Sequence, residues 1–127
     1  MGVEVTTSVQ MRFSDIDSFG HVNNLAQQAY FDLGKVELFD RVLCKVDTTS
    51  AMLVSLSTDF MQQIRWNDQI EVVTRVESIG NKSLTLQQEI LRGEEICARC
   101  RSVMVAFDKR LGEAVRVPDE WRRICGA

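Results

Sequence analysis

The apolar residues between positions 25 and 43 follow a helical period, and no proline and only one glycine interrupt them. They fall on two stripes of the helix surface rather than on one. One stripe holds Ala29, Leu33, Val36 and Leu43, and the other holds Phe31, Leu38 and Val42. Because both stripes need apolar cover, the pattern predicts a long helix that is buried on more than one side.

From residue 52 onward the period changes to the alternation typical of β-strands. Four such runs cover residues 52–61, 70–77, 84–91 and 96–107. The segments between them are short and carry Gly, Asn or Asp, which favours hairpin turns. A shorter β-like segment at residues 9–15 precedes the helix. The predicted order is therefore one strand, one long helix and four antiparallel strands.

This order predicts an α+β fold in which one long helix is wrapped by a five-stranded antiparallel sheet. The chain has one proline and no linker-like or repeated segment, so residues 1–127 are expected to form a single domain. A single sheet has open edge strands, and pairing with a second copy is a common way to cover an edge. We therefore expect a homodimer or a homotetramer.

The composition narrows the class of protein. Apolar residues make up 45% and charged residues 26% of the chain, which excludes a disordered protein. The net charge is −3 with no block of Lys or Arg, which argues against a nucleic-acid partner. No apolar run approaches the roughly 20 residues of a membrane span, and the first residues do not resemble a signal peptide. We expect a soluble cytoplasmic protein.

Four cysteines raise the possibility of a zinc site or of disulfides. Cys97 and Cys100 form a C-x-x-C pair, but no second pair accompanies them. Residues three apart on a strand point to opposite faces, so these two thiols are not expected to share a ligand. We expect no metal site, and four reduced thiols at Cys44, Cys97, Cys100 and Cys125 in a reducing compartment.

The candidate chemistry lies directly before the helix, in residues 15–24 with the sequence D-I-D-S-F-G-H-V-N-N. Two carboxylates, the only histidine and two adjacent amides fall within ten residues. Asp, Asn and Gly also form turns and helix caps, and Asp15 fits a bracing role in such a loop.

The string D-x-D-x-x-G-H-V-N-N is followed by a helix, by D-F-M-x-x-I-R-W-N-D-Q-I-E-V and by V-E-S-I-G-N-K-S-L. In this order the segments resemble the hotdog-fold acyl-CoA thioesterases of the 4-hydroxybenzoyl-CoA thioesterase superfamily, and they are also similar to plant fatty acyl-ACP thioesterases. The resemblance runs from about residue 9 to the C-terminal V-P-D-E-W-R. It implies a hotdog fold and hydrolysis of an acyl thioester, with CoA as part of the substrate and no further cofactor.

The resemblance also implies catalytic roles for three residues. Asp17 corresponds to the carboxylate that attacks the thioester carbonyl or acts as general base on a water. The backbone N–H of Asn24 corresponds to the oxyanion donor, at the positive end of the helix dipole. This N–H is free if Asn23 caps the helix, and the site is weaker if Asn24 itself is the cap. His21 matches a histidine that positions substrate or water.

Substrate contacts implied by the resemblance form two groups. The residues around the motif are Phe19, Gly20, Asn23 and Tyr30, and those in the turn between the middle strands, where the family holds pantetheine and nucleotide, are Asn81, Lys82 and Ser83. An ordinary hairpin turn with a solvated lysine explains the second group equally well. Phe19 replaces the asparagine of the plant branch, which indicates a more apolar acyl site.

Three questions stay open at this point. A hotdog hydratase or dehydratase also uses an Asp/His pair, although the close spacing of Asp17 and His21 favours the thioesterase. Gln27 and Asp32 differ from the Tyr and Glu of many relatives. A non-catalytic module that binds acyl thioesters therefore stays an alternative function. The carrier of the acyl group is either CoA or acyl carrier protein.

Overall fold

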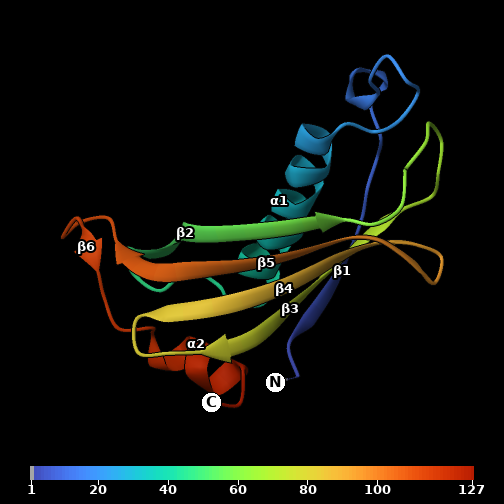
Figure 1. The fold of residues 1–127 in the computed structure, drawn as a ribbon. Coiled ribbons are helices and arrows are strands. Elements are labelled where there is room, and N and C mark those ends of the chain that lie inside the picture. Colours follow the sequence, from blue (N-terminus) through green and yellow to red (C-terminus); the bar gives the residue numbers. More distant parts are fainter. Residues whose placement is uncertain (1) are drawn as a thin grey trace.

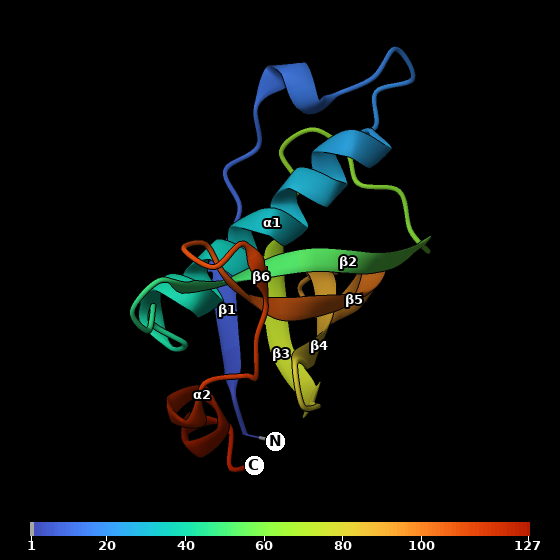
Figure 2. The same cartoon turned by 90° about the vertical axis from the view of Figure 1, so that its left-hand side faces the viewer.

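One long helix crosses one face of an antiparallel sheet in the computed structural model, which describes residues 2–127 (Figures 1 and 2). The helices are α1 (Asn24–Arg41) and a short C-terminal α2 (Asp119–Ile124). The strands are β1 (Glu4–Ser8), β2 (Thr49–Phe60), β3 (Glu71–Ile79), β4 (Ser83–Arg92), β5 (Glu95–Asp108) and β6 (Glu113–Ala114). The predicted α+β arrangement of a helix on a sheet is confirmed.

The sheet has the strand order β1-β3-β4-β5-β2, and the two-residue β6 pairs with the end of β5. The strands β2, β3, β4 and β5 correspond to the four runs predicted after the helix, whereas β1 and β6 were not predicted at these positions. All pairings are antiparallel, and β3, β4 and β5 are joined by tight hairpins. The strands β1 and β2 lie at the two edges of the sheet.

The first strand lies earlier in the chain than predicted. The prediction of a strand at residues 9–15 is wrong, because β1 ends at Ser8 and Phe13–Asp15 form a turn of 3₁₀ helix, η1. Val9 N–H still donates to Ile70 O at 3.3 Å, after which the chain leaves the sheet. The reason is that the side chain of Asp15 bonds to Tyr30 on α1, which draws this segment toward the helix.

The helix packs tightly against the sheet at Gly34. A Cβ atom there would lie 2.9 Å from Cγ1 of Val72 and closer still to Oγ1 of Thr74. Beside this contact the buried Gln88 donates from Nε2 to Phe31 O at 2.7 Å and to Thr74 Oγ1 at 2.9 Å. The absence of a side chain at Gly34 therefore lets α1 pack directly on β3.

The helix is not buried on both sides within one chain, contrary to the prediction. Phe31 and Leu38 are fully buried against the sheet, whereas Leu33 and Val36 on the other stripe are 47% and 56% exposed. The sheet covers only one side of α1. The last strand, β2, pairs with β5 along one of its edges and has no strand beside its other edge within the described chain. Four exposed apolar side chains on the helix side of the sheet form what we call the β2–α1 apolar surface: Leu33 and Val36 of α1, and Leu53 and Leu56 of β2, which pair with the buried Met104 and Ser102.

All four cysteines are free thiols. Cys97 and Cys100 are both buried in the same part of the core, so the prediction that they point to opposite faces is wrong. The reason is a bulge: Ile90 pairs with Ala98 and Leu91 pairs with Ile96, which leaves Cys97 without a partner and breaks the alternation of faces. Burial raises the pKa of both thiols. Across residues 2–127, no helix has the length and apolar character needed to cross a membrane.

Candidate active site

Asp17 begins a tight turn that reverses the chain between Ile16 and Val22, which pair in an antiparallel bridge. The turn is closed by Gly20 N–H, which donates to Asp17 O at 3.1 Å, and by Asp17 N–H, which donates to His21 O at 2.8 Å. Gly20 has φ +86°, a conformation that glycine adopts without steric cost. The glycine of the motif is therefore needed for the turn that presents Asp17.

The carboxylate of Asp17 is oriented by backbone amides. Its Oδ1 accepts from Phe19 N–H at 2.9 Å and from His21 N–H at 3.2 Å. Its Oδ2 takes part in no hydrogen bond within the described chain, and the side chain is half-buried. One oxygen thus fixes the group in place while the other remains available for chemistry.

The capping residue of α1 is Asn23. Its Oδ1 accepts from Ala26 N–H at 2.7 Å. The N–H groups of Asn24 and Leu25 find no acceptor among residues 2–127. Asn23 rather than Asn24 is therefore the N-cap, which leaves the Asn24 N–H free. This N–H lies at the positive end of the helix dipole.

Asp15, two residues before Asp17, lies in a different environment. It is 2% exposed, and its Oδ2 accepts from Tyr30 OH at 2.6 Å and from Arg12 N–H at 3.0 Å. The Arg12 guanidinium donates to Oδ1 at 3.1 Å. Burial alone would raise the pKa of Asp15, but the hydrogen bonds from Tyr30 and Arg12 outweigh it and hold the pKa below its ordinary value. Burial and the adjacent carboxylate raise the pKa of Tyr30.

The loop that follows β2 lies against the motif (Figure 1). Val22 N–H donates to Ile64 O at 2.7 Å, and His21 pairs with Arg65 in a further antiparallel bridge. Between the loop and the motif is a cavity of about 230 Å³. Its lining consists of Asp17, His21, Val22, Asn24, Gln27 and residues 60–63.

The structure brings the three predicted catalytic residues, Asp17, His21 and Asn24, into the wall of this one cavity. Gly20 and Asn23 shape the wall through the turn and the cap. Phe19 is 83% exposed at the tip of the turn, outside the lining. Tyr30 is 3% exposed with its hydroxyl bound to Asp15, so within one chain it braces the loop rather than lining the cavity.

The turn of Asn81, Lys82 and Ser83 lies at the other end of the sheet (Figure 1). Ser83 pairs with Val105, which in turn pairs with Met52 near the start of β2. The cavity lies beyond the far end of β2, so about eight residues of strand, or roughly 26 Å, separate the two in one chain. Arg122 of α2 steadies the turn by donating from Nη2 to Asn81 O at 3.0 Å.

Two parts of the cavity were not singled out by the sequence. Residues 60–63 follow Asp17 by more than forty positions, and the tertiary contacts of Val22 with Ile64 and of His21 with Arg65 place them there. Gln27 is buried, with Nε2 donating to Val22 O at 3.3 Å and Oε1 without a partner among the described residues. In the sequence Gln27 stands out as a departure from the family pattern, and its position in the first turns of the helix is the signal that could place it in the site.

The cavity contains the groups that acyl transfer requires. A carboxylate with an unused oxygen has the chemistry of a nucleophile or general base, and an unpaired N–H at a helix N-terminus has the chemistry of an oxyanion donor. Within residues 2–127, no group of three or more His, Cys, Asp or Glu side chains is arranged to hold a metal ion.

The chain belongs to the thioesterase-like superfamily, whose family model matches residues 11–124. It is 31% identical over 116 residues to the uncharacterized protein YsmA of Bacillus subtilis, covering 88% of this chain and 78% of YsmA. A predicted thioesterase from Bacillus stearothermophilus is 30% identical and superimposes with a TM-score of 0.86, covering 95% of this chain and 92% of that one. A Thermus thermophilus thioesterase, solved with coenzyme A and Zn, is 24% identical with a TM-score of 0.85, covering 96% and 97%. The predicted family and hotdog fold are confirmed.

Proposed function

We propose that this protein is an acyl-CoA thioesterase that hydrolyses a thioester to a free acid and CoA, in a cytoplasm whose reducing conditions suit its four free thiols. The observation that carries the proposal is the shared cavity of Asp17, His21 and the unpaired Asn24 N–H. Membership of the thioesterase-like superfamily supports thioester hydrolysis as the general chemistry. The coenzyme A in the Thermus thermophilus structure supports CoA as the carrier.

In the proposed mechanism the thioester carbonyl oxygen accepts a hydrogen bond from Asn24 N–H. Asp17 Oδ2 then attacks the carbonyl carbon, the C–S bond breaks and CoA leaves as the thiol after protonation; water hydrolyses the resulting acyl anhydride. Alternatively, Oδ2 takes a proton from a water that attacks the carbonyl directly. In both routes negative charge develops on the carbonyl oxygen, where the helix dipole and the N–H stabilise it. His21 positions the substrate or the water.

A second copy of the chain completes the proposed site. The strand β2 has twelve residues, lies at the edge of the sheet and carries exposed apolar side chains. Edge strands of this kind tend to pair with a strand of another chain. Two-fold antiparallel pairing of β2 with itself covers the β2–α1 apolar surface. It also sets the Thr49 end of one strand beside the Phe60 end of the other. The turn of Asn81, Lys82 and Ser83 then approaches the partner's cavity, where it contacts pantetheine and nucleotide.

The assembly is tested by light scattering and sedimentation at low protein concentration, with activity followed in parallel. We expect a dimer, or a tetramer made of two dimers. A charged substitution on the β2 edge, Leu56→Lys, is expected to shift the protein toward monomer and to reduce activity with it. A stable monomer of full activity contradicts the shared site.

The reaction is tested with a thiol-trapping reagent on a panel of acyl-CoA and acyl-ACP substrates, with Asp17→Asn as the control. We expect thiol release that depends on Asp17. Loss of acyl-CoA without free thiol would instead indicate a hydratase or dehydratase. Tight binding without turnover would indicate a binding module.

A further inference from the structure

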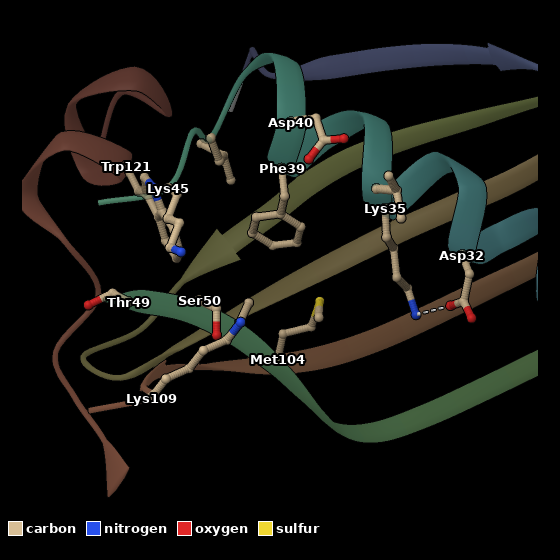
Figure 3. A pocket seen from close by; sticks show the side chains of 13 residues that line it. Asp32, Lys35, Phe39, Asp40, Lys45, Thr49, Ser50, Met104, Lys109 and Trp121 are labelled. Carbon is tan, nitrogen blue, oxygen red and sulfur yellow. Dashed lines mark ion pairs between the residues drawn. The ribbon is translucent and has the colours of Figure 1, made fainter. Parts of the chain in front are cut away.

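A second cavity, of about 410 Å³, lies between the C-terminal half of α1, the start of β2 and α2 (Figure 3). Its walls are mainly apolar, with Phe39, Met104 and Trp121 among them. It shares no lining residue with the Asp17 cavity of the same chain. Its charged groups are three lysines and two aspartates: Lys35, Lys45, Lys109, Asp32 and Asp40.

Lys35 distinguishes this cavity from an ordinary surface groove. Its side chain is only 8% exposed and extends from α1 toward β2 and β5 (Figure 3). Its ammonium makes no hydrogen bond with any of residues 2–127, and its one ion-pair contact is Asp32 Oδ1 at 3.8 Å. Asp32 is itself 73% exposed, so water screens much of this attraction.

The Lys35 side chain is enclosed over most of its length, and its ammonium has no hydrogen-bond partner among residues 2–127, so its N–H donors are open to water or to a ligand in the cavity. Lysines near a surface usually extend their charged end into water. Lys35 therefore holds three N–H donors in a mainly apolar space that is large enough for a ligand. An anionic group is the ligand chemistry that satisfies it.

In the proposed dimer this cavity lies beside the Asp17 site of the partner subunit. Lys35 follows Asn24 by eleven residues, about 16 Å along the helix, so the cavity is remote from Asp17 of its own chain. Antiparallel pairing of β2 with its copy places the start of that strand, which borders the cavity at Ser50 and Ala51, beside the end of the partner's β2. The cavity then faces the partner's Asp17 site.

We propose that this cavity receives the far end of the acyl group and that Lys35 binds a carboxylate there, which makes CoA thioesters of dicarboxylic acids the preferred substrates. The inference rests on the proposed thioesterase function and names its substrate class. The three lysines and two aspartates leave one positive charge, which a single carboxylate balances. The apolar walls suit the methylene groups between the two ends of the acyl chain.

The nucleotide of CoA fits this cavity less well. It carries several phosphate charges, whereas the cavity has a net charge of only one and apolar walls. An acyl group with one terminal carboxylate matches both features.

The test compares two substrates of equal length, adipyl-CoA and hexanoyl-CoA. For the unmodified protein we expect kcat/KM to be at least about tenfold higher with adipyl-CoA, the scale of a hydrogen-bonded charge. Lys35→Met keeps the length and apolar body of the side chain and should abolish that preference by lowering kcat/KM for adipyl-CoA alone. Because the ammonium makes no hydrogen bond within residues 2–127 and its ion-pair partner Asp32 is exposed, thermal denaturation should show little loss of stability.

Arg41→Met is the matched control, since Arg41 is an exposed cation on the same helix outside the cavity. It should leave the preference unchanged. A preference that survives Lys35→Met overturns the proposal. So does an equal loss on both CoA thioesters that disappears with acyl-pantetheine substrates, because that result assigns Lys35 to the phosphates.

Failure of the thioesterase function is distinguishable from failure of this inference. If no acyl-CoA releases thiol, the proposed function fails, and calorimetric binding of adipyl-CoA and hexanoyl-CoA to the intact protein still tests Lys35. Tighter binding of adipyl-CoA that is lost in Lys35→Met supports the carboxylate site. Equal binding of the two overturns it.

Discussion

Asp15 and Asp17 are the same residue type two positions apart, yet they occupy opposite environments. Asp15 is 2% exposed and accepts from Tyr30 and Arg12 through both oxygens. Asp17 is half-buried, uses only Oδ1 for hydrogen bonds in the described chain, and lines a cavity. Unused hydrogen-bonding capacity beside a cavity, rather than residue type, therefore distinguishes the carboxylate that we propose as catalytic from the one that braces the loop.

The largest expected effect separates the two carboxylates by activity. Asp17→Asn keeps an oxygen that accepts from Phe19 and His21 N–H but removes the nucleophile or base. We expect kcat to fall roughly 10²- to 10⁴-fold with little change in thermal stability. Asp15→Asn should retain far more activity per folded molecule. Equal losses in the two variants would contradict the division of roles.

The next effect concerns stability at Asp15. Tyr30→Phe removes the hydroxyl that donates to the buried carboxylate at 2.6 Å. The free energy of unfolding, measured in urea, should fall by about 2 kcal/mol, because the carboxylate loses a donor that water cannot readily replace. In an Asp15→Asn background the same change should cost less. Identical costs in both backgrounds would show that the hydroxyl does not support the carboxylate.

A smaller effect is expected at the cap that leaves the Asn24 N–H free. Asn23→Ala removes the acceptor for Ala26 N–H and should lower the free energy of unfolding by about 1 kcal/mol. It should also lower kcat, since the first turn of the helix, which holds the proposed oxyanion donor, loosens. Asn23→Asp, which keeps the acceptor, should restore both quantities. Failure of this rescue would place the role of Asn23 elsewhere.

The smallest effect appears only in acid. Because the pKa of Asp15 is lower in the folded protein, its contribution to stability is complete above the ordinary Asp pKa of about 3.9. The contribution is lost as the pH falls toward the lowered value. Plots of unfolding free energy against pH should therefore drop less steeply below about pH 4 in Asp15→Asn than in the unmodified protein. Parallel curves would mean that Asp15 does not contribute in this way.

The positions of the long elements follow from local pattern. The predicted helix at residues 25–43 and the four later strands lie within a few residues of α1, β2, β3, β4 and β5. Short-range periodicity suffices here because it depends only on residues that are neighbours in the chain. The first strand was misplaced since residues 9–15 alternate like a strand, whereas a bond from Asp15 to Tyr30 decides their path.

The features of the candidate site also fall into those that the local sequence determines and those that depend on tertiary packing. The sequence by itself determined the motif, its place before the helix and the resemblance that assigns Asp17, because all of these lie in one continuous segment. Only the tertiary structure decided that Asn23 is the cap, that residues 60–63 close the cavity and that the turn at Lys82 lies at the opposite end of the sheet. It also placed Lys35 inside a cavity of α1 and β2. Such contacts depend on how the sheet packs on the helix. Local sequence patterns do not reveal which distant segments of the chain will pack together.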